Sequence, residues 1–442
     1  MPVIHQLAEK VWKDTVLKIR RDIHKYPEDA FCEYRTASKV IERLKLIGYE
    51  VLFGEQVNQT AAVQNAIPSS ERSEQEIKRA LADGAKLEYV QDMKYGKTGV
   101  VGVLYCGEGP VVGIRCDMDA VQVEEYDGPD HIPSVENFRS VYAGYNHSCG
   151  HDAHTAIGLG LAEAMMELKK QDKLRGTLKL FFEPAEEVFA GGKSMTDSGI
   201  ADDLTHMFAI HMAVSTRKTG QVAGSIKDFP IIEKYNIHFK GKNAHADYAP
   251  EQGHNALLAA CIAAVGLHAI TRHSSGNSRI NVGWIQSGSG GNLNAIPGTA
   301  DLVLELSAFR DDVFQFLKET AQAVVHGAAQ MYGCEEQISP NCSAIPVESV
   351  TCNPEMIEIV RCAVSKIPEV TEFIPSGSLR GAGEDASLFI KKAQENGGMG
   401  TYILFGSDLS NAAHTARYDV DPRALLIATE TMIRILADVM RK

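Results

Sequence analysis

Apolar segments of strand length that lead into acidic or imidazole side chains constrain the fold of this chain most. Helical periodicity marks stretches between them, such as residues 155–168. Strands that alternate with helices predict an α/β domain, with a mostly parallel central sheet flanked by helices. In such sheets, ligands bind beyond the carboxyl ends of the strands. The segments are residues 110–115 before Asp117, residues 176–182 before Glu186 and Glu187, and residues 204–212, which contain His211.

The pattern changes at about residue 228, where predicted strands and helices follow in the order β-α-β-β-α-β. This order is typical of a ferredoxin-like α+β unit. We therefore predict a catalytic α/β domain in two parts, residues 1–227 and 341–442, with residues 228–340 inserted between them. A smaller insertion at about residues 55–95 combines a polar loop with a charged helical stretch at residues 70–93.

Composition narrows the choice of partners and compartment. The chain has 442 residues, too many for one simple core, and its net charge of −13 argues against nucleic acid as a partner. The longest apolar stretch, residues 256–270, is interrupted by His268 and is shorter than the roughly 18 residues of a membrane span. Nine cysteines without paired spacing fit a reducing compartment better than a disulfide framework. We expect a cytoplasmic protein with no membrane anchor.

The segment from His147 to His154 places three imidazoles and one thiol within eight residues. Thiolate and imidazole are ligands that zinc-like ions prefer. A closed zinc knuckle is the structural alternative, but it draws four ligands from paired spacings such as C-x-x-C, and this sequence contains no C-x-x-C. We therefore predict an open metal site that includes Cys149 and His151.

Adjacent glutamates such as Glu186 and Glu187 are often no more than a solvated surface pair. Here they follow a buried strand and a proline turn, which favours a functional role. One carboxylate can then bind a metal while the other handles protons, as metal-assisted hydrolysis requires. His211 and His414, taken alone, fit ordinary core histidines equally well.

Asp117 and Asp119 end a buried strand, where a carboxylate needs a partner. Binding a metal or supporting a ligating imidazole would supply that partner. For Asp119, a turn or a helix cap is the alternative. We include Asp117 among the predicted catalytic residues.

Together these segments resemble the di-metal amidohydrolase family that includes hippurate hydrolase, bacterial aminoacylases and plant auxin-conjugate hydrolases. The likeness covers nearly the whole chain and is strongest to the branch of aminobenzoyl-glutamate hydrolase. The motifs that carry it are Arg21-Asp-Ile-His24 with Pro27-Glu28, Asp117-Met-Asp-Ala120, His147 to His154, Glu183-Pro-Ala-Glu-Glu187, Ala244-His-Ala246, Asn294-Ala-Ile-Pro297 and Gly383-Glu-Asp385.

The resemblance implies two divalent metal ions, zinc or manganese, with the Cys149 thiolate bridging them. Glu186 would act as the general base and then protonate the leaving amine. The inserted domain would serve as a lid and form a homodimer. His245 on that domain would stabilise the developing oxyanion, within one chain or across the dimer; a strand-end residue that contacts only its own domain is the alternative. The implied metal ligands are Cys149, His151, Glu187, His211 and His414.

The chain departs from its relatives at one position of the predicted substrate site. Asn294 would contact the substrate, but the arginine that usually follows on the next strand, where it binds the substrate carboxylate, is Ser307 here. Arg310 would replace it only if that strand is locally bulged. We predict hydrolysis of the amide bond of N-acyl or N-aroyl amino acids, with p-aminobenzoyl-glutamate as the favoured substrate.

Three alternatives to that substrate and role stay open at this point. They are another N-acyl amino acid of the hippurate type, a dipeptide, and a non-catalytic binding subunit of the same fold. The sequence also leaves open whether a second, distinct hydrolase subunit is required.

Overall fold

A computed structural model describes residues 2–212, 216–227, 229–288, 293–341, 349–379, 383–408 and 411–442. These residues form two compact units. Unit 1 consists of Met1–Asp228 and Val350–Lys442, and unit 2 of Phe229–Ser349. Each unit has its own hydrophobic core.

Unit 1 is built on an eight-stranded sheet in the order β1-β2-β4-β3-β5-β16-β6-β14. Its four central strands, β4, β3, β5 and β16, run parallel, so their carboxyl ends meet at one edge. The antiparallel pairs involve β1, β2 and β6. In the order of the sheet, the strands are Glu50–Phe53, Val100–Tyr105, Thr177–Glu183, Val111–Asp117, His206–Met212, Met399–Phe405, Gln221–Ala223 and Glu372–Ile374.

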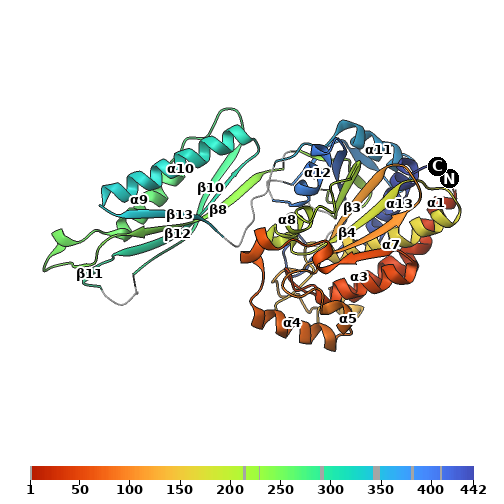
Figure 1. The fold of residues 1–442 in the computed structure, drawn as a ribbon, viewed down its shortest axis with the longest axis horizontal. Helices are drawn as coiled ribbons and strands as arrows, with labels where there is room; N and C mark the ends of the chain where they lie inside the picture. The colour runs from red at the N-terminus through yellow and green to blue at the C-terminus, as the bar shows by residue number, and fades with distance from the viewer. Residues whose placement is uncertain are drawn as a thin grey trace. The chain divides into compact units, whose positions relative to one another are not determined.

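Helices cover both faces of this sheet, which is why its central strands are apolar on both sides. Helices α3, α7 and α13 pack on one face, and α8 and α12 on the other (Figure 1). In β4, Phe182 joins the core beneath α7, whereas Phe181 packs against Phe389 of α12 with ring centroids 5.2 Å apart. The helices of unit 1 are α1 Pro2–Val11, α2 Leu17–Lys25, α3 Tyr34–Ile47, α4 Ser70–Ala82, α5 Leu87–Val90, α6 Ile132–Val135, α7 His151–Lys170, α8 Gly191–Thr196, α11 Pro354–Val364, α12 Ala386–Glu395 and α13 Pro422–Val439.

Short elements complete unit 1. A π-helical turn joins α1 to α2, and three 3-10 turns and the two-stranded pair β7 and β15 connect the remaining elements. The turns are η1 Trp12–Val16, η2 Gly54–Gln56, η3 Ala61–Ala66 and η4 Glu186–Val188, and the two strands are Ile226–Lys227 and Gly377–Ser378.

Unit 2 contains a four-stranded antiparallel sheet in the order β10-β12-β8-β13, with α9 and α10 on one face (Figure 1). At one end of the sheet, the short strands β9 and β11 pair with each other. Along the chain the elements are β8 Ile231–Lys240, β9 Ala244–His245, η5 Pro250–Gln252, α9 Ala256–His268, β10 Ser278–Ser287, β11 Ala295–Ile296, β12 Thr299–Ala308, α10 Asp311–Met331 and β13 Glu335–Pro340.

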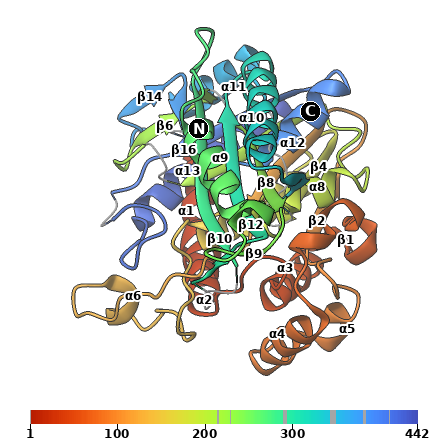
Figure 2. The same ribbon diagram turned by 90° about the vertical axis from the view of Figure 1, so that its left-hand side faces the viewer.

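The predicted fold class, a mostly parallel sheet flanked by helices with a ferredoxin-like insert, is confirmed. Two predicted helices were wrong in detail. The charged stretch at residues 70–93 forms two helices beside α3, because Gly84 adopts a left-handed φ of 95° after α4 (Figure 2). Helix α7 begins at His151 rather than at residue 155. None of the helices in the described part of the chain is long and apolar enough to cross a membrane.

Candidate metal centre

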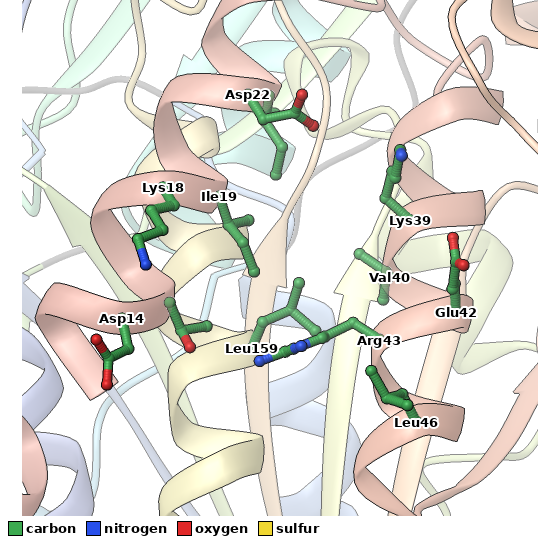
Figure 3. A pocket seen from close by; sticks show the side chains of 12 residues that line it. Asp14, Lys18, Ile19, Asp22, Lys39, Val40, Glu42, Arg43, Leu46 and Leu159 are labelled. Atoms are coloured by element: carbon green, nitrogen blue, oxygen red, sulfur yellow. The ribbon is translucent and has the colours of Figure 1, made fainter. Parts of the chain in front are cut away.

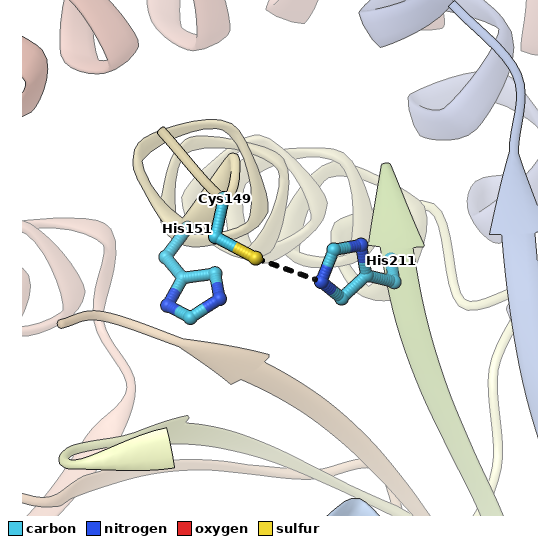
Figure 4. Close-up of side chains that lie close together, drawn as sticks. All are labelled: Cys149, His151 and His211. Carbon is cyan, nitrogen blue, oxygen red and sulfur yellow. Dashed lines mark hydrogen bonds between the residues drawn. The ribbon is translucent and has the colours of Figure 1, made fainter. Parts of the chain in front are cut away.

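The predicted metal ligands meet at the carboxyl edge of the parallel strands of unit 1. Cys149, His151 and His211 form one group whose ligand atoms lie within 4.8 Å of one another. Cys149, Glu187 and His414 form a second group within the same limit. The two groups share the Cys149 sulfur, so this single thiol adjoins both candidate ion positions. Figure 4 shows Cys149 and His151 at the start of α7, with His211 approaching from β5.

A glycine brings the first two ligands side by side. Gly150 precedes α7 with a φ of 93°, in the left-handed region that a residue with a side chain adopts at a cost. A Cβ at this position would also lie 2.7 Å from the hydroxyl of Tyr418. The Cys-Gly-His spacing is therefore a requirement of the turn that starts the helix.

Hydrogen bonds turn both imidazoles toward the shared sulfur and the carboxylates. The Nδ1 atom of His211 lies 2.9 Å from its neighbour's carbonyl oxygen on Met212, while Nε2 lies 3.5 Å from the Cys149 sulfur. The Nδ1 atom of His151 lies 3.2 Å from Asp119. In each ring one nitrogen donates its proton to an oxygen, and the other is left with a lone pair for a metal.

His154 lies in the same cluster, but both of its ring nitrogens are already used. Its Nε2 accepts the backbone N–H of Met212 at 2.8 Å, so the proton is on Nδ1, which donates to Asp117 at 2.5 Å. Asp117 thereby supports an imidazole, one of the two roles predicted for it. Burial alone would raise the pKa of Asp117, but Arg115 and the imidazoles of His151 and His154 hold it well below its ordinary value.

The turn that carries the two glutamates is held in an unusual backbone conformation. Ala185 and Phe189, on either side of it, have φ values of 54° and 56°. The N–H of Glu187 donates to Asp119 at 2.9 Å, and its carboxylate lies 3.1 Å from the Nε2 atom of His414. Left-handed conformations at residues with a side chain are often found where a site dictates the geometry.

His414 reaches this turn from the other end of the chain. It too is left-handed, with a φ of 58°, and its N–H donates to the carbonyl oxygen of Ser148 at 2.8 Å. The segment of His414 is thus fixed directly to the segment of Cys149, although 265 residues separate them in sequence, from 149 to 414.

The donor set fits a divalent cation. Among the described residues, the buried Nε2 atom of His151 has no hydrogen-bond partner. It faces carboxylate oxygens of Asp117, Glu186 and Glu187 at 3.7–3.8 Å, too far for hydrogen bonds. An ion between these atoms would satisfy all of them. Thiolate, imidazole and carboxylate together suit zinc and, less strongly, manganese.

Burial also prepares the two groups expected to lose or carry protons. It raises the pKa of the Cys149 thiol, and the charges of Glu187 and Glu186 raise it further. Burial likewise raises the pKa of Glu186, helped by the negative charges of Glu384 and Glu187. A carboxyl group with a raised pKa suits proton transfer near neutral pH.

A buried arginine beneath the site was missed by the sequence reasoning. Arg115 is fully buried and contacts Asp117 at 2.6 Å, Glu384 at 2.9 Å and Asp385 at 3.1 Å, as well as Glu183. One cation therefore balances several carboxylates beside the metal ligands. The Gly383-Glu-Asp385 motif was a signal for this network, but the arginine on the strand was not recognised as its partner.

A groove of about 350 Å³ on the helices of unit 1 is lined by other residues (Figure 3). Ile19, Val40 and Leu159 contribute aliphatic side chains. Asp14, Asp22 and Glu42 face Lys18, Lys39 and Arg43 around it. Such a lining is typical of a surface groove between helices, and the hydrolytic chemistry lies with the metal centre.

The remaining predicted residues belong to unit 2. His245 and Asn294 come together through the pairing of β9 with β11, and the Asn294 amide lies 3.4 Å from the Nε2 atom of His245. The Nδ1 atom of His245 accepts the N–H groups of Asp247 and Tyr248 at 3.2 and 3.1 Å. Since an N–H group can only donate, neutral His245 carries its proton on Nε2.

Arg310 is not brought together with this pair. It follows β12, whereas Asn294 precedes it, and a ten-residue strand spans about 30 Å. The pairing of β12 with β8 runs without a register shift from Thr299 to Ala308, so the bulge that Arg310 would need is not present there. Arg310 instead forms two hydrogen bonds with Asp312, both at 2.9 Å.

Another arginine lies next to the substituted position. Arg279 of β10 is the cross-strand partner of Ser307, so the two side chains lie on the same face of the sheet. The sequence reasoning missed Arg279, because strand register is not visible in the sequence.

Comparison with known proteins decides the family. Residues 113–438 match the model of Peptidase family M20/M25/M40. The chain belongs to this family. It is therefore a hydrolase of metallopeptidase type, and the predicted resemblance is confirmed. The match spans every residue of the metal centre.

Relatives of known name cover nearly the whole chain. It is 37% identical to one of the subunits of p-aminobenzoyl-glutamate hydrolase of Escherichia coli, over 94% of this chain and 93% of the relative. It is 36% identical to indole-3-acetyl-aspartic acid hydrolase of Enterobacter agglomerans, over 98% and 97%.

Solved structures agree with this fold. An aminobenzoyl-glutamate utilization protein from Klebsiella pneumoniae is 32% identical, with a TM-score of 0.76 over 99% of this chain and 97% of that one. A protein from Bacillus subtilis, described as a dinuclear metal binding peptidase from the M20 family, shares the fold at 21% identity, with a TM-score of 0.70 over 100% and 99%.

Proposed function

We propose that this protein is a two-metal amidohydrolase that cleaves N-acyl or N-aroyl amino acids, with p-aminobenzoyl-glutamate as the favoured substrate. One observation carries the proposal: two groups of ligand atoms share the Cys149 sulfur at the carboxyl edge of the sheet. The names of two relatives, one from an aminobenzoyl-glutamate hydrolase and one an indole-acetyl-aspartate hydrolase, support an acyl amino acid as substrate.

Cys149, His151, Glu187, His211 and His414 would hold the two ions. When bound, the ions supply Lewis-acid polarisation of the amide carbonyl and an activated water near neutral pH. Glu186 takes a proton from the attacking water. After the carbon–nitrogen bond breaks, it gives that proton to the leaving amine. The raised pKa of Glu186 fits both transfers.

His245 would stabilise the oxyanion that develops on the substrate carbonyl. The backbone N–H groups on its Nδ1 atom fix the proton on Nε2, which is the tautomer needed to donate. Asn294, beside that nitrogen, would contact the substrate carbonyl or carboxylate. For the carboxylate we propose Arg279, because it is the cation adjacent to Ser307 on the sheet of unit 2.

A homodimer through unit 2 is the proposed assembly. Strand β10 forms an edge of the sheet, and edge strands are open to pairing with another chain. Apolar side chains beside it are exposed, including Val265 of α9 at 69% and Trp284 of β10 at 48%. An apolar helix face next to an open strand edge suits a second copy of the chain.

The dimer is tested by molar mass in solution. A double substitution, Val265→Glu with Trp284→Glu, should halve the mass measured by light scattering. Leu46→Glu alters an equally exposed leucine, 74% accessible, on unit 1 and is the matched control. A wild-type mass of one chain would contradict the homodimer.

Two further proposals concern the setting of the enzyme. Because the relative from Escherichia coli is named as one of several hydrolase subunits, we propose that this chain too has a second, distinct partner chain. A cytoplasmic location is supported by the eight cysteines that the structure describes, all of which are unpaired. Full turnover by the purified chain alone would show that such a partner is dispensable.

A substrate panel tests the reaction. Protein loaded with zinc or manganese should cleave p-aminobenzoyl-glutamate faster, in kcat/KM, than hippurate, N-acetyl amino acids or a dipeptide. A preference for hippurate or a dipeptide would correct the substrate but keep the reaction. No turnover of any amide by metal-loaded protein, with or without a partner chain, would favour a binding role and contradict the proposal.

A further inference from the structure

A buried carboxylate outside the metal centre contacts the turn that bears the glutamates. Glu33 precedes α3, and its side chain is fully buried. One oxygen accepts the N–H of Ala185 at 2.8 Å and the N–H of Phe31 at 3.0 Å. The other accepts the hydroxyl of Thr98 at 2.6 Å. The residue before Glu186 is thus held by a side chain 152 positions away.

The backbone at this contact is strained. Ala185 and Phe31 both occupy the left-handed region, with φ of 54° and 57°. A residue with a side chain adopts this conformation only when its surroundings enforce it. Both N–H groups converge on the same oxygen of Glu33, so this carboxylate favours the strained conformation at both residues.

Glu33 is free for this contact because another residue does its expected work. It occupies the N-cap position of α3, but its side chain makes no capping hydrogen bond. Glu28 accepts the N–H groups of Arg35 and Thr36 at the start of the helix instead, both at 2.8 Å. Two buried carboxylates five residues apart therefore have different tasks: Glu28 caps a helix, and Glu33 reaches the turn of Glu186.

We propose that Glu33 is a positioning residue for hydrolysis, holding Ala185 so that Glu186 and Glu187 face the metal centre. A second carboxylate completes the support from the other side, since Asp119 accepts the N–H of Glu187 at 2.9 Å. The inference rests on the proposed role of Glu186 as the general base. Glu33 touches neither substrate nor metal, and it acts through the backbone.

The experiment compares Glu33→Ala, Glu33→Gln and Glu28→Ala in the full-length, metal-loaded protein. Glu33→Ala should lower kcat by about 100-fold with little change in KM, because misplacing a reacting group by about 1 Å costs this much. It should also weaken metal binding, measured by competition with a chelating dye, because Glu187 is on the same turn. Glu33→Gln should restore both values, since its carbonyl oxygen accepts the same N–H groups.

Glu28→Ala is the matched control. It removes a buried carboxylate that also accepts two backbone N–H groups, so its melting temperature should fall while kcat and metal affinity remain unchanged. If Glu33→Ala behaves like Glu28→Ala, the proposal is wrong. Should Glu33→Ala fail to fold, Glu33→Asp serves in its place, because it keeps the charge but is too short to reach Ala185.

Glu186→Ala separates this inference from the proposed function. If Glu186→Ala is inactive and Glu33→Ala keeps wild-type kcat and metal affinity, only the positioning role fails. If Glu186→Ala turns over at the wild-type rate, the general base is misassigned. The metal affinity of Glu33→Ala then decides the positioning role alone.

Discussion

The metal centre of unit 1 and the His245 region of unit 2 are held in very different ways. In unit 1 the ligand segments are buried and fixed to one another, as by the N–H of His414 on the carbonyl oxygen of Ser148. In unit 2, His245 and Asn294 are exposed and are held by a short strand pair and a turn. The centre that binds ions is thus rigidly preformed, while the group proposed to stabilise the oxyanion lies on a separate compact unit.

The largest expected effect comes from removing the shared ligand. Cys149→Ala should lose both metal ions and all measurable turnover, because the sulfur belongs to both ligand groups. His414→Ala should lose only one ion, since the group of Cys149, His151 and His211 stays complete. Metal analysis of protein purified without chelator measures both stoichiometries. Equal metal content in the two variants would contradict the shared thiolate.

Substitution of His245 probes the exposed side of the comparison. His245→Ala should lower kcat by about 100- to 1,000-fold, the usual cost of losing an oxyanion donor. Metal content and melting temperature should not change, because His245 lies outside the buried cluster. Steady-state kinetics with metal analysis checks this. A loss of metal along with activity would place His245 in the metal centre instead.

A smaller effect is expected from the arginine beside Ser307. Arg279→Ala should raise KM for acidic substrates roughly tenfold or more, since a hydrogen bond to a charged group contributes about 1.5–3 kcal/mol. Arg310→Ala is the control and should leave KM unchanged, because Arg310 pairs with Asp312. Ser307→Arg should restore binding in the Arg279→Ala background. Unchanged KM in Arg279→Ala would show that another cation binds the carboxylate.

The smallest effect concerns the stability of unit 1 against pH. Burial alone would lower the pKa of His24, but hydrogen bonds with Asp152 and Glu125 raise it from 6.5 to about 9. Protonated His24 therefore stabilises the fold fully below pH 6.5. That contribution, on the order of 3 kcal/mol, is lost as the pH rises through about 9. Thermal unfolding at about pH 6 and about pH 9 should show the loss in wild type and a flatter profile in His24→Gln. Parallel profiles would refute it.

Local sequence patterns predicted the residues of the centre but not the contacts that hold them. The Cys-Gly-His turn and the acidic pair after a strand are short-range signals, and both fall at the carboxyl edge of the sheet. Arg115, Glu33 and Arg279 were missed, because each acquires its role from partners on other strands or helices. Such partners are set by strand register and packing, which no short window of sequence records.

By itself the sequence determined the alternation of strands and helices, the inserted ferredoxin-like unit and the chemical types of the metal ligands. Only the tertiary structure decided that Cys149 joins two ligand groups, that His154 is occupied on both nitrogens and that Ser307 faces Arg279. The physical reason is range. Periodicity and turn chemistry act over a few residues, whereas a metal centre depends on distances of a few ångströms between segments hundreds of residues apart.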